Sequence, residues 1–468
     1  MQVFHFIYNL LWGDLFTIPL PGGSSVGISL LVLILIPMGL YFTVRTKCLP
    51  VRCFPEMLRI TAEKKTTKAG AISGVQALMV STATRVGMGN LVGVVAALSA
   101  GGAGAVFWMW VTALIGSSTA YIEATLAQMH KEPDPMYGGY RGGPAHYIHH
   151  LFGGKRRFSI LAILFALSGL LCWGGISQVI GNSVSSAFEY AFHIPPIVST
   201  VILVALSAVI VLRKNATVKV LDILVPIMAG IYFVAAIFII VKNVGQLPVV
   251  FSRIFEEAFG LRQVVAGGFG AALMNGVKRG LFSNEAGSGS APCAAASADV
   301  SHPAKAGLYQ ALGVFIDTII ICTCTAMIML LVPEDLLAGL EGMPLLQTAM
   351  QYHFGQAGVI FIAIILWLFS FSTFLGVLYY ARPNVAYLFG NRTIAQLCCK
   401  ILYLVMLFIG GLAAYTFVWD LGDIGIALCT VINAIAIIPL SGKAVRALNE
   451  YMAQSKAERK AKKEQKDA

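Results

Sequence analysis

The sequence predicts an all-α polytopic membrane protein with 11 transmembrane helices. Of its 468 residues, 57% are hydrophobic and only 12% are charged, and the mean hydropathy is +0.79. Soluble proteins carry about 25% charged residues. Apolar runs long enough to cross a bilayer as helices recur along the whole chain. A β-barrel would instead show short segments of alternating polarity.

The apolar runs give the expected spans in order. We place them at 26–44, 70–99, 103–129, 158–191, 196–213, 219–241, 263–298, 306–332, 356–381, 398–418 and 422–440. A straight crossing takes about 20 residues. The spans 70–99, 158–191 and 263–298 are longer, so each must tilt, break or extend beyond the bilayer.

Basic residues predict the orientation of these spans. With 11 alternating spans, 27 of the lysines and arginines fall on one side and 3 on the other. Basic loops stay in the cytoplasm, so the N-terminal segment 1–25 is predicted outside the cell and the basic tail 441–468 in the cytoplasm. The predicted location is a bacterial inner membrane. This topology accounts for the net charge of +11, so no nucleic-acid partner is expected. The tail is predicted to be a solvated helix or a weak contact for anionic membrane lipid.

The stretch ATRVGMGN, residues 83–90, predicts a helix break inside the span 70–99. Gly87 and Gly89 permit non-helical dihedral angles, and Thr84 and Asn90 offer side-chain oxygens. A broken helix leaves unpaired backbone groups, which are tolerated in a membrane only where they line a cavity. Close helix packing through small residues is the alternative.

A second break is predicted in the span 263–298, which carries Asn275, Lys278, Arg279, Asn284 and Glu285. Charges inside a membrane are costly and mark functional sites. Two positions stay open. Depth in the membrane favours the segment Asn275–Phe282, whereas the pair Gly287 and Gly289, followed by Ser290 and a proline, indicates a helix restart with a serine cap.

The two predicted breaks lie five spans apart. The chain then divides into a leading span, 26–44, and two five-helix units, 70–241 and 263–440, each beginning with a broken helix. Because five is an odd number, the units insert with opposite orientations. This arrangement is an inverted repeat, and corresponding breaks in its halves point to the binding site.

Three motifs resemble signatures of the alanine or glycine:cation symporter family. They are GGAGAVFWMWVTALIG at 101–116, RGGPAHYI at 141–148 and GLFSNEAGSGSAP at 280–292. The resemblance implies a leucine-transporter-like fold with sodium as the coupling ion and no other cofactor. It also implies symport of small neutral amino acids, alanine and glycine, into the cell.

A more distant resemblance assigns a sodium site. The segment RVGMGN is similar to the first broken helix of the neurotransmitter:sodium symporters. By that likeness, the backbone N–H groups of Met88 and Gly89 receive the substrate carboxylate. Sodium would bind five oxygens, a type of ligand that suits a hard cation. These are the carbonyls of Ala83, Val86 and Phe369 and the hydroxyls of Ser372 and Thr373.

The resemblance also implies a substrate pocket. Trp367 and Ile364, one turn apart, would wall its side-chain end, and Gln178, with Asn182 on the same helix face, would lie against the substrate. Lipid-facing or packing roles are the alternative for the first two residues, and interhelical hydrogen bonds for the second two. Carbonyls near Asn275–Phe282 would accept the ammonium group, or Asn284 if the break lies later. Thr84, Gly87 and Asn90 complete this predicted set.

Intramembrane charges leave an alternative mechanism open. Arg85 is expected to turn away from the sodium site and pair with Glu285 or Glu123, because a fixed cation would repel sodium. Together with Asp222 and Asp317, these two acids could instead relay protons in a proton-coupled carrier. The chain has no HExxH or nucleotide-binding glycine motif, so an enzyme is not expected.

Overall fold

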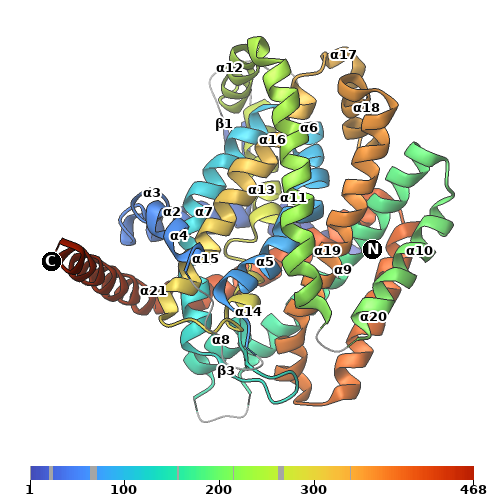
Figure 1. Ribbon diagram of the computed structural model, residues 1–468. Helices are drawn as coiled ribbons and strands as arrows, with labels where there is room; N and C mark the ends of the chain where they lie inside the picture. Colours follow the sequence, from blue (N-terminus) through green and yellow to red (C-terminus); the bar gives the residue numbers. More distant parts are fainter. Residues whose placement is uncertain are drawn as a thin grey trace.

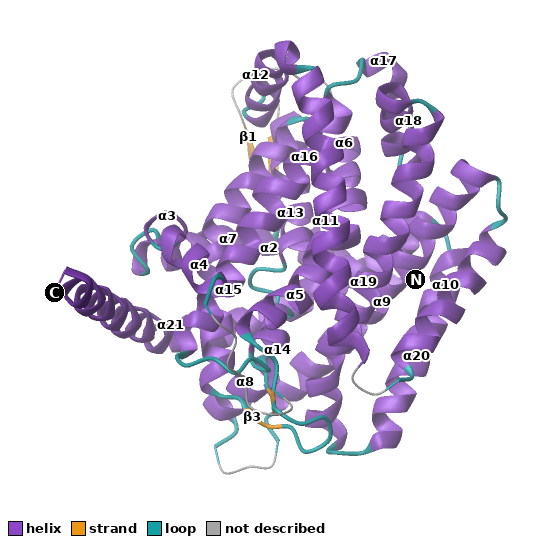
Figure 2. Cartoon of the chain, in the orientation of Figure 1, coloured by secondary structure: helices purple, strands orange, loops and turns teal. Residues whose placement is uncertain are grey.

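The computed structural model describes residues 2–19, 25–63, 71–154, 158–213, 216–261, 268–337 and 339–467. These residues form a bundle of helices, most of which run roughly along one direction (Figure 1). The basic run 155–157 and the first residues of the predicted span 263–298 lie outside the described residues. Figure 2 shows that strands are a minor part of the chain. The predicted all-helical class is therefore confirmed.

Eight helical segments of the described chain are long and apolar enough to cross a membrane. They are Gly74–Gly101, Gly104–Met129, Ile160–Phe192, Thr217–Lys242, Pro303–Leu330, Gln356–Phe389, Thr393–Leu412 and Phe417–Ala461. Two further apolar helices are shorter, α2 (Leu30–Arg45) and α10 (Pro196–Val211). The interrupted segment α13–α14 (Gly268–Asn284 and Ala291–Ala295) lies between α12 and α15. The count of 11 spans stays a prediction.

Several spans consist of more than one helical segment. The first long span is α5 (Gly74–Thr84), the π-helical η1 (Arg85–Gly93) and α6 (Val94–Gly101). Another joins α15 (Pro303–Val314), the π-helical η3 (Phe315–Ile321) and α16 (Cys322–Leu330). The remaining long helices are α7 (Gly104–Met129), α9 (Ile160–Phe192), α11 (Ala216–Lys242), α19 (Gln356–Phe389), α20 (Thr393–Leu412) and α21 (Tyr415–Asp467).

Short elements cover the two ends of the bundle. The helices α12, α17 and α18 lie together at the end that is uppermost in Figure 1, and α8 and β3 lie at the opposite end. Strand β1 pairs antiparallel with β2, and β3 pairs antiparallel with β4. The bounds of these elements and the other short helices are α1 (Gln2–Trp12), β1 (Phe16–Pro19), β2 (Ser25–Ile28), α3 (Leu49–Arg52), α4 (Phe54–Thr61), β3 (Glu132–Pro133), β4 (Tyr140–Arg141), α8 (Pro144–Phe152), η2 (Val244–Gln246), α12 (Leu247–Ala258), α17 (Glu334–Leu337) and α18 (Met343–Phe354).

Small residues let neighbouring helices approach closely. A Cβ atom at Gly410 in α20 would lie 2.2 Å from the backbone oxygen of Gln178 in α9, and one at Gly181 would lie 2.2 Å from the backbone oxygen of Leu407. Side chains cannot fit at such contacts, so glycine is required there. Association through small residues is the usual way for helices to pack in a membrane. It holds α9 against α20.

The C-terminal part of α21 is attached to α4 through one buried carboxylate. Glu56 accepts hydrogen bonds from Arg59 Nη2 (2.6 Å), Tyr451 Oη (2.6 Å) and Ser455 Oγ (3.0 Å), and it pairs with Arg459. Burial by itself raises the pKa of Glu56, but the hydrogen bonds from Arg59, Tyr451 and Ser455 lower it to about 2. The segment 451–459 is therefore a packed element rather than a freely solvated helix.

Candidate functional site

The first predicted break is present where η1 begins. Val86 (φ −76°, ψ 70°) and Gly87 (φ −148°, ψ −141°) leave helical geometry, and the helix resumes after them. The N–H of Gly87 donates to Asn90 Oδ1 at 3.2 Å, and the N–H of Met88 donates to Thr373 Oγ1 at 3.3 Å. Side chains thus satisfy two of the backbone groups that the break releases.

The second break lies at the later of the two positions that the sequence left open. Helix α13 continues through Asn284, and α14 begins at Ala291. Between them, Glu285, Gly287 and Gly289 have positive φ angles of 55°, 94° and 80°, a conformation that favours glycine. The segment Asn275–Phe282 is helical, so placing the break there was wrong. Membrane depth counted along the sequence could not reveal that α13 continues past that level.

Glu123 of α7 holds the second break open. Its Oε1 accepts the N–H of Gly287 and its Oε2 accepts the N–H of Gly289, both at 3.2 Å. Asn433 of α21 donates to Glu123 Oε2 and to the Gly287 carbonyl, both at 2.9 Å. The carboxylate of Glu123 thus replaces the helical hydrogen-bond acceptors that these two N–H groups lose at the break. Asn433 was missed, although an asparagine in an apolar run is a recognised signal.

Asp317 in η3 joins the two breaks. Its carboxylate accepts hydrogen bonds from Asn90 Nδ2 (2.6 Å), which follows the first break, and from Ser283 Oγ (2.8 Å), which precedes the second. Thr318 Oγ1 donates to the same carboxylate at 2.6 Å. Single-turn π-helical segments inside α-helices are often found at functional sites. One buried side chain thus contacts both discontinuous helices.

Four of the five predicted sodium ligands lie together. The hydroxyl of Thr373 is 3.1 Å from the Ala83 carbonyl oxygen and 2.8 Å from the Phe369 carbonyl oxygen. The hydroxyl of Ser372 is 3.4 Å and 2.8 Å from the same two oxygens. Val86, the fifth residue, lies at the break itself. The five predicted ligand atoms are all neutral oxygens, which fit a hard monovalent cation.

The helix that resumes after the first break approaches the last turn of α13, just before the second break, at Gly89 and Phe282. A Cβ atom on Gly89 would lie 3.5 Å from the Phe282 carbonyl oxygen. This carbonyl belongs to the last turn of α13, where the helix has no further N–H groups to pair with it. The ring of Phe282 packs against that of Trp419 in α21, with centroids 4.9 Å apart. The close approach places backbone groups of both breaks, and two aromatic rings, around one point.

Other predicted substrate contacts face different partners. Gln178 Nε2 lies 3.1 Å from Met406 Sδ, and Asn182 Nδ2 donates to the Ala413 carbonyl at 2.8 Å. Both therefore make the interhelical contacts that were the alternative interpretation. Ile364 is 47% exposed, which favours the lipid-facing role that was the alternative, and its place in a pocket wall stays a prediction. Trp367, half-buried, stacks on Phe371 at 5.5 Å, and its role stays a prediction.

The asparagines of α13 and the hydroxyl of Thr84 are also engaged. Asn275 Nδ2 donates to the Ala271 carbonyl at 3.0 Å, away from the break. Asn284 Oδ1 accepts the N–H of Ala286 at 3.0 Å, while its buried Nδ2 has no hydrogen-bond partner among the described residues. Thr84 Oγ1 lies 2.7 Å from Tyr380 Oη and 3.4 Å from Glu285 Oε2. Asn284 alone retains a free donor at the second break.

Arg85 does turn away from the predicted sodium site, but it does not pair with an acid. Its Nη1 donates to the carbonyl and to Oε1 of Gln310 in α15, at 3.2 and 3.1 Å. Within the described residues it has no carboxylate within 4 Å, so the predicted pairing with Glu285 or Glu123 was wrong. Gln310 was missed because a neutral amide gives no charge signal in the sequence.

A charged cluster lies near the first turns of α21. Asp423 accepts a bidentate pair from Arg279 (3.1 and 3.0 Å) and contacts Lys278 Nζ at 2.7 Å. The Arg279 guanidinium also lies 4.3 Å from the centre of the Trp419 ring. Helix α1 adds Tyr8, whose hydroxyl accepts from Lys278 at 2.5 Å. The two cations of α13 thus share one carboxylate, Asp423, close to Trp419.

Discontinuous helices that meet inside an all-helical membrane bundle are typical of secondary transporters. Comparison with known proteins gives the family. The profile of the sodium:alanine symporter family matches residues 23–466, and the chain belongs to that family.

Three relatives from Bacillus subtilis (strain 168) are similar over most of their length. The amino-acid carrier protein AlsT is 41% identical, covering 90% of this chain and 89% of the relative. A probable sodium/glutamine symporter, GlnT, is 40% identical with coverages of 92% and 89%. A putative sodium/proton-dependent alanine carrier protein, YrbD, is 38% identical with coverages of 91% and 90%. These similarities identify a transporter and not an enzyme.

Solved structures share the fold at low sequence identity. A manganese transporter of Eremococcus coleocola superposes with a TM-score of 0.51 at 14% identity, covering 82% of this chain and 81% of that chain. A sodium-coupled sialic acid symporter superposes with a TM-score of 0.50 at 13% identity, with coverages of 89% and 83%. The shared architecture is that of membrane transporters.

Proposed function

We propose that the protein carries alanine and glycine into the cell together with sodium by alternating access. The single observation that supports this most strongly is the close approach of Gly89, just after the first break, to Phe282, just before the second, beside the oxygen cluster of Thr373. Membership of the sodium:alanine symporter family supports the sodium and alanine parts of the proposal. Glycine is included because the signature motifs of the sequence resemble those of carriers of small neutral amino acids.

The substrate is proposed to bridge the breaks. Its carboxylate would face the N–H groups at Gly89 and Met88, where the second half of the first broken helix begins, and its ammonium group would face the Phe282 carbonyl. The amino end of a helix carries a partial positive charge, which attracts the carboxylate, and the carboxyl end carries a partial negative charge, which attracts the ammonium group. Phe282 and Trp419 would limit the side chain by clash, which excludes larger residues more effectively than a missing methylene excludes smaller ones.

Sodium is proposed to bind the carbonyls of Ala83, Val86 and Phe369 and the hydroxyls of Ser372 and Thr373. These groups link α5 to α19, so an ion among them favours the conformation in which the two helices are close. The repeat units 70–241 and 263–440, the leading span 26–44, the external N-terminal segment and the cytoplasmic tail in a bacterial inner membrane belong to the same proposal.

Uptake measurements test the proposal directly. Proteoliposomes should accumulate radiolabelled alanine and glycine when sodium is imposed outside, and not when choline replaces it. Flux that only equilibrates the two compartments would indicate a channel and contradict the mechanism.

Proton coupling is a second candidate, and one observation favours it. Asp317, a carboxyl group, contacts both breaks, so its protonation would change the same bonds that position them. The relative YrbD is described as sodium/proton-dependent. Uptake that survives replacement of sodium by choline but is abolished by a protonophore would support this candidate.

A further inference from the structure

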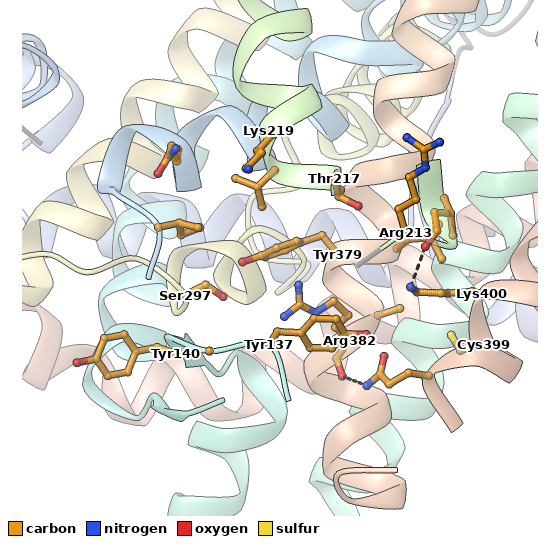
Figure 3. A pocket seen from close by; sticks show the side chains of 18 of the residues that line it. Tyr137, Tyr140, Arg213, Thr217, Lys219, Ser297, Tyr379, Arg382, Cys399 and Lys400 are labelled. Carbon is orange, nitrogen blue, oxygen red and sulfur yellow. Dashed lines mark hydrogen bonds between the residues drawn. The ribbon is translucent and has the colours of Figure 1, made fainter. Parts of the chain in front are cut away.

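A basic cavity of about 240 Å³ lies away from the two breaks, where several membrane helices end (Figure 3). It is found between the end of α10, the start of α11, the last turns of α19 and the start of α20. Four cationic side chains from these four places line it: Arg213, Lys219, Arg382 and Lys400. Among the described residues that line the cavity, none is acidic.

Two of the four cations already have partners. Arg382 Nη2 lies 3.1 Å from Asp134 Oδ2, and its guanidinium lies 3.6 Å from the centre of the Tyr137 ring. Lys400 Nζ donates to the Val211 carbonyl at 2.8 Å. These contacts fix the two side chains in place, and the lysine has no acidic partner among the described residues.

The other two cations face the cavity without an ion pair. Arg213 and Lys219 are exposed, and neither pairs with an acidic side chain of the described chain. Figure 3 shows both on one side of Tyr379, with Arg382 on the other side. Positive charges gathered in a concave space with low-dielectric walls concentrate a positive potential there. An anion in the cavity would relieve the repulsion among them.

An apolar groove adjoins the basic cavity. The two share Cys399, and the groove is lined by Leu170 of α9, Val385 and Phe389 of α19, and Tyr403 of α20. Helix α20 turns much of its surface away from the protein interior. The groove also includes Arg392 at the turn between α19 and α20. Both hollows therefore lie near helix ends, where a lipid could present its headgroup and the first part of its acyl chains to the protein.

We propose that this pair of hollows binds an anionic glycerophospholipid. The phosphate would lie among Arg213, Lys219 and Lys400, and an acyl chain would follow the groove past Cys399. Guanidinium and ammonium groups are the usual protein ligands of phosphate, and basic pockets between membrane helices recognise such headgroups. A net negative lipid satisfies the unpaired cations, whereas a zwitterionic one brings its own positive charge into the cavity.

Thermal unfolding of the delipidated full-length protein in neutral detergent tests the proposal. Phosphatidylglycerol should raise the unfolding temperature, and phosphatidylcholine with the same acyl chains or inorganic phosphate should raise it far less. The double variant Arg213→Gln/Lys219→Gln should need roughly thirtyfold more phosphatidylglycerol for half the effect, since each basic residue near an anionic surface contributes about a factor of five. The control Lys443→Gln/Arg446→Gln removes two exposed cations of α21 outside the cavity and should leave the effect unchanged.

Three outcomes would overturn the proposal. Equal stabilisation by phosphatidylcholine would remove the role of charge, and full stabilisation by inorganic phosphate would indicate a site for a free anion. An unchanged response in the double variant would place lipid elsewhere. If that variant does not fold, native mass spectrometry of the unmodified protein in an equal mixture of the two lipids decides: preferential retention of phosphatidylglycerol supports the proposal, and equal retention contradicts it.

Discussion

The hydroxyl of Thr373 should control how strongly uptake depends on sodium. In the structure this oxygen lies 3.1 Å from the Ala83 carbonyl and 2.8 Å from the Phe369 carbonyl, and it is one of five proposed ligands. Hydrogen bonds to charged groups contribute about 1.5–3 kcal/mol, and we take a similar value for an oxygen that contacts the ion. Because water can partly replace the hydroxyl, the lower end applies, which corresponds to roughly a tenfold change in affinity.

The assay is alanine uptake into proteoliposomes as a function of external sodium. Thr373→Ala should raise the half-saturating sodium concentration about tenfold and leave the preference for alanine over valine unchanged. Thr373→Ser keeps the hydroxyl and should behave like the unmodified protein. A sodium curve that does not shift in the alanine variant would refute the reasoning. Equal shifts in both variants would show that the methyl group matters instead.

The other predictions concern the aromatic wall, the residue that joins the breaks and the attachment of the tail. Trp419→Ala should admit valine or leucine as competitors of alanine uptake, and Trp367→Ala, measured alongside, tests the pocket inferred from the sequence. Asp317→Ala should lower maximal uptake at least tenfold, because a buried unpaired partner on each break costs about 1–3 kcal/mol; near-normal uptake would mean that the breaks do not need it. The pKa of Glu56 is lowered to about 2, so its stabilising bonds are complete above the unfolded value of about 4.5 and are lost as the pH falls toward 2. Pepsin should therefore release the tail faster as the pH drops from 4.5 to 2.5, whereas Glu56→Gln should be cleaved rapidly throughout; equal, pH-independent rates in both proteins would contradict this.

Much of the fold could be predicted because hydropathy reports burial in a membrane directly. The segment 83–90 was identified as a break from two glycines and two polar residues, and the structure has non-helical angles at Val86 and Gly87. The clustering of Ala83, Phe369, Ser372 and Thr373 followed from a resemblance and could not have been found by spacing alone, since α5 and α19 are far apart in the sequence.

The remainder depended on packing that one sequence does not reveal. The second break is positioned by Glu123 of α7 and Asn433 of α21, and local sequence gives no indication that these side chains meet it. The surroundings of Ile364 could not be predicted because the rotation of α19 about its axis decides which face is buried. Arg85 was expected to need a carboxylate, yet a neutral amide, Gln310, accepts its hydrogen bonds.

Helix α1 affects how the protein can be handled in the laboratory. Trp12 Nε1 donates to the Asp423 carbonyl at 3.1 Å, and Tyr8 accepts from Lys278. Asp423 lies about one turn after Trp419 in α21, and Lys278 lies about one turn before Phe282 in α13. An affinity tag or fluorescent reporter joined directly to the amino end would therefore pull on residues close to both aromatic rings. A label at the far end of α21, beyond the residues that contact Glu56, would leave both attachments undisturbed.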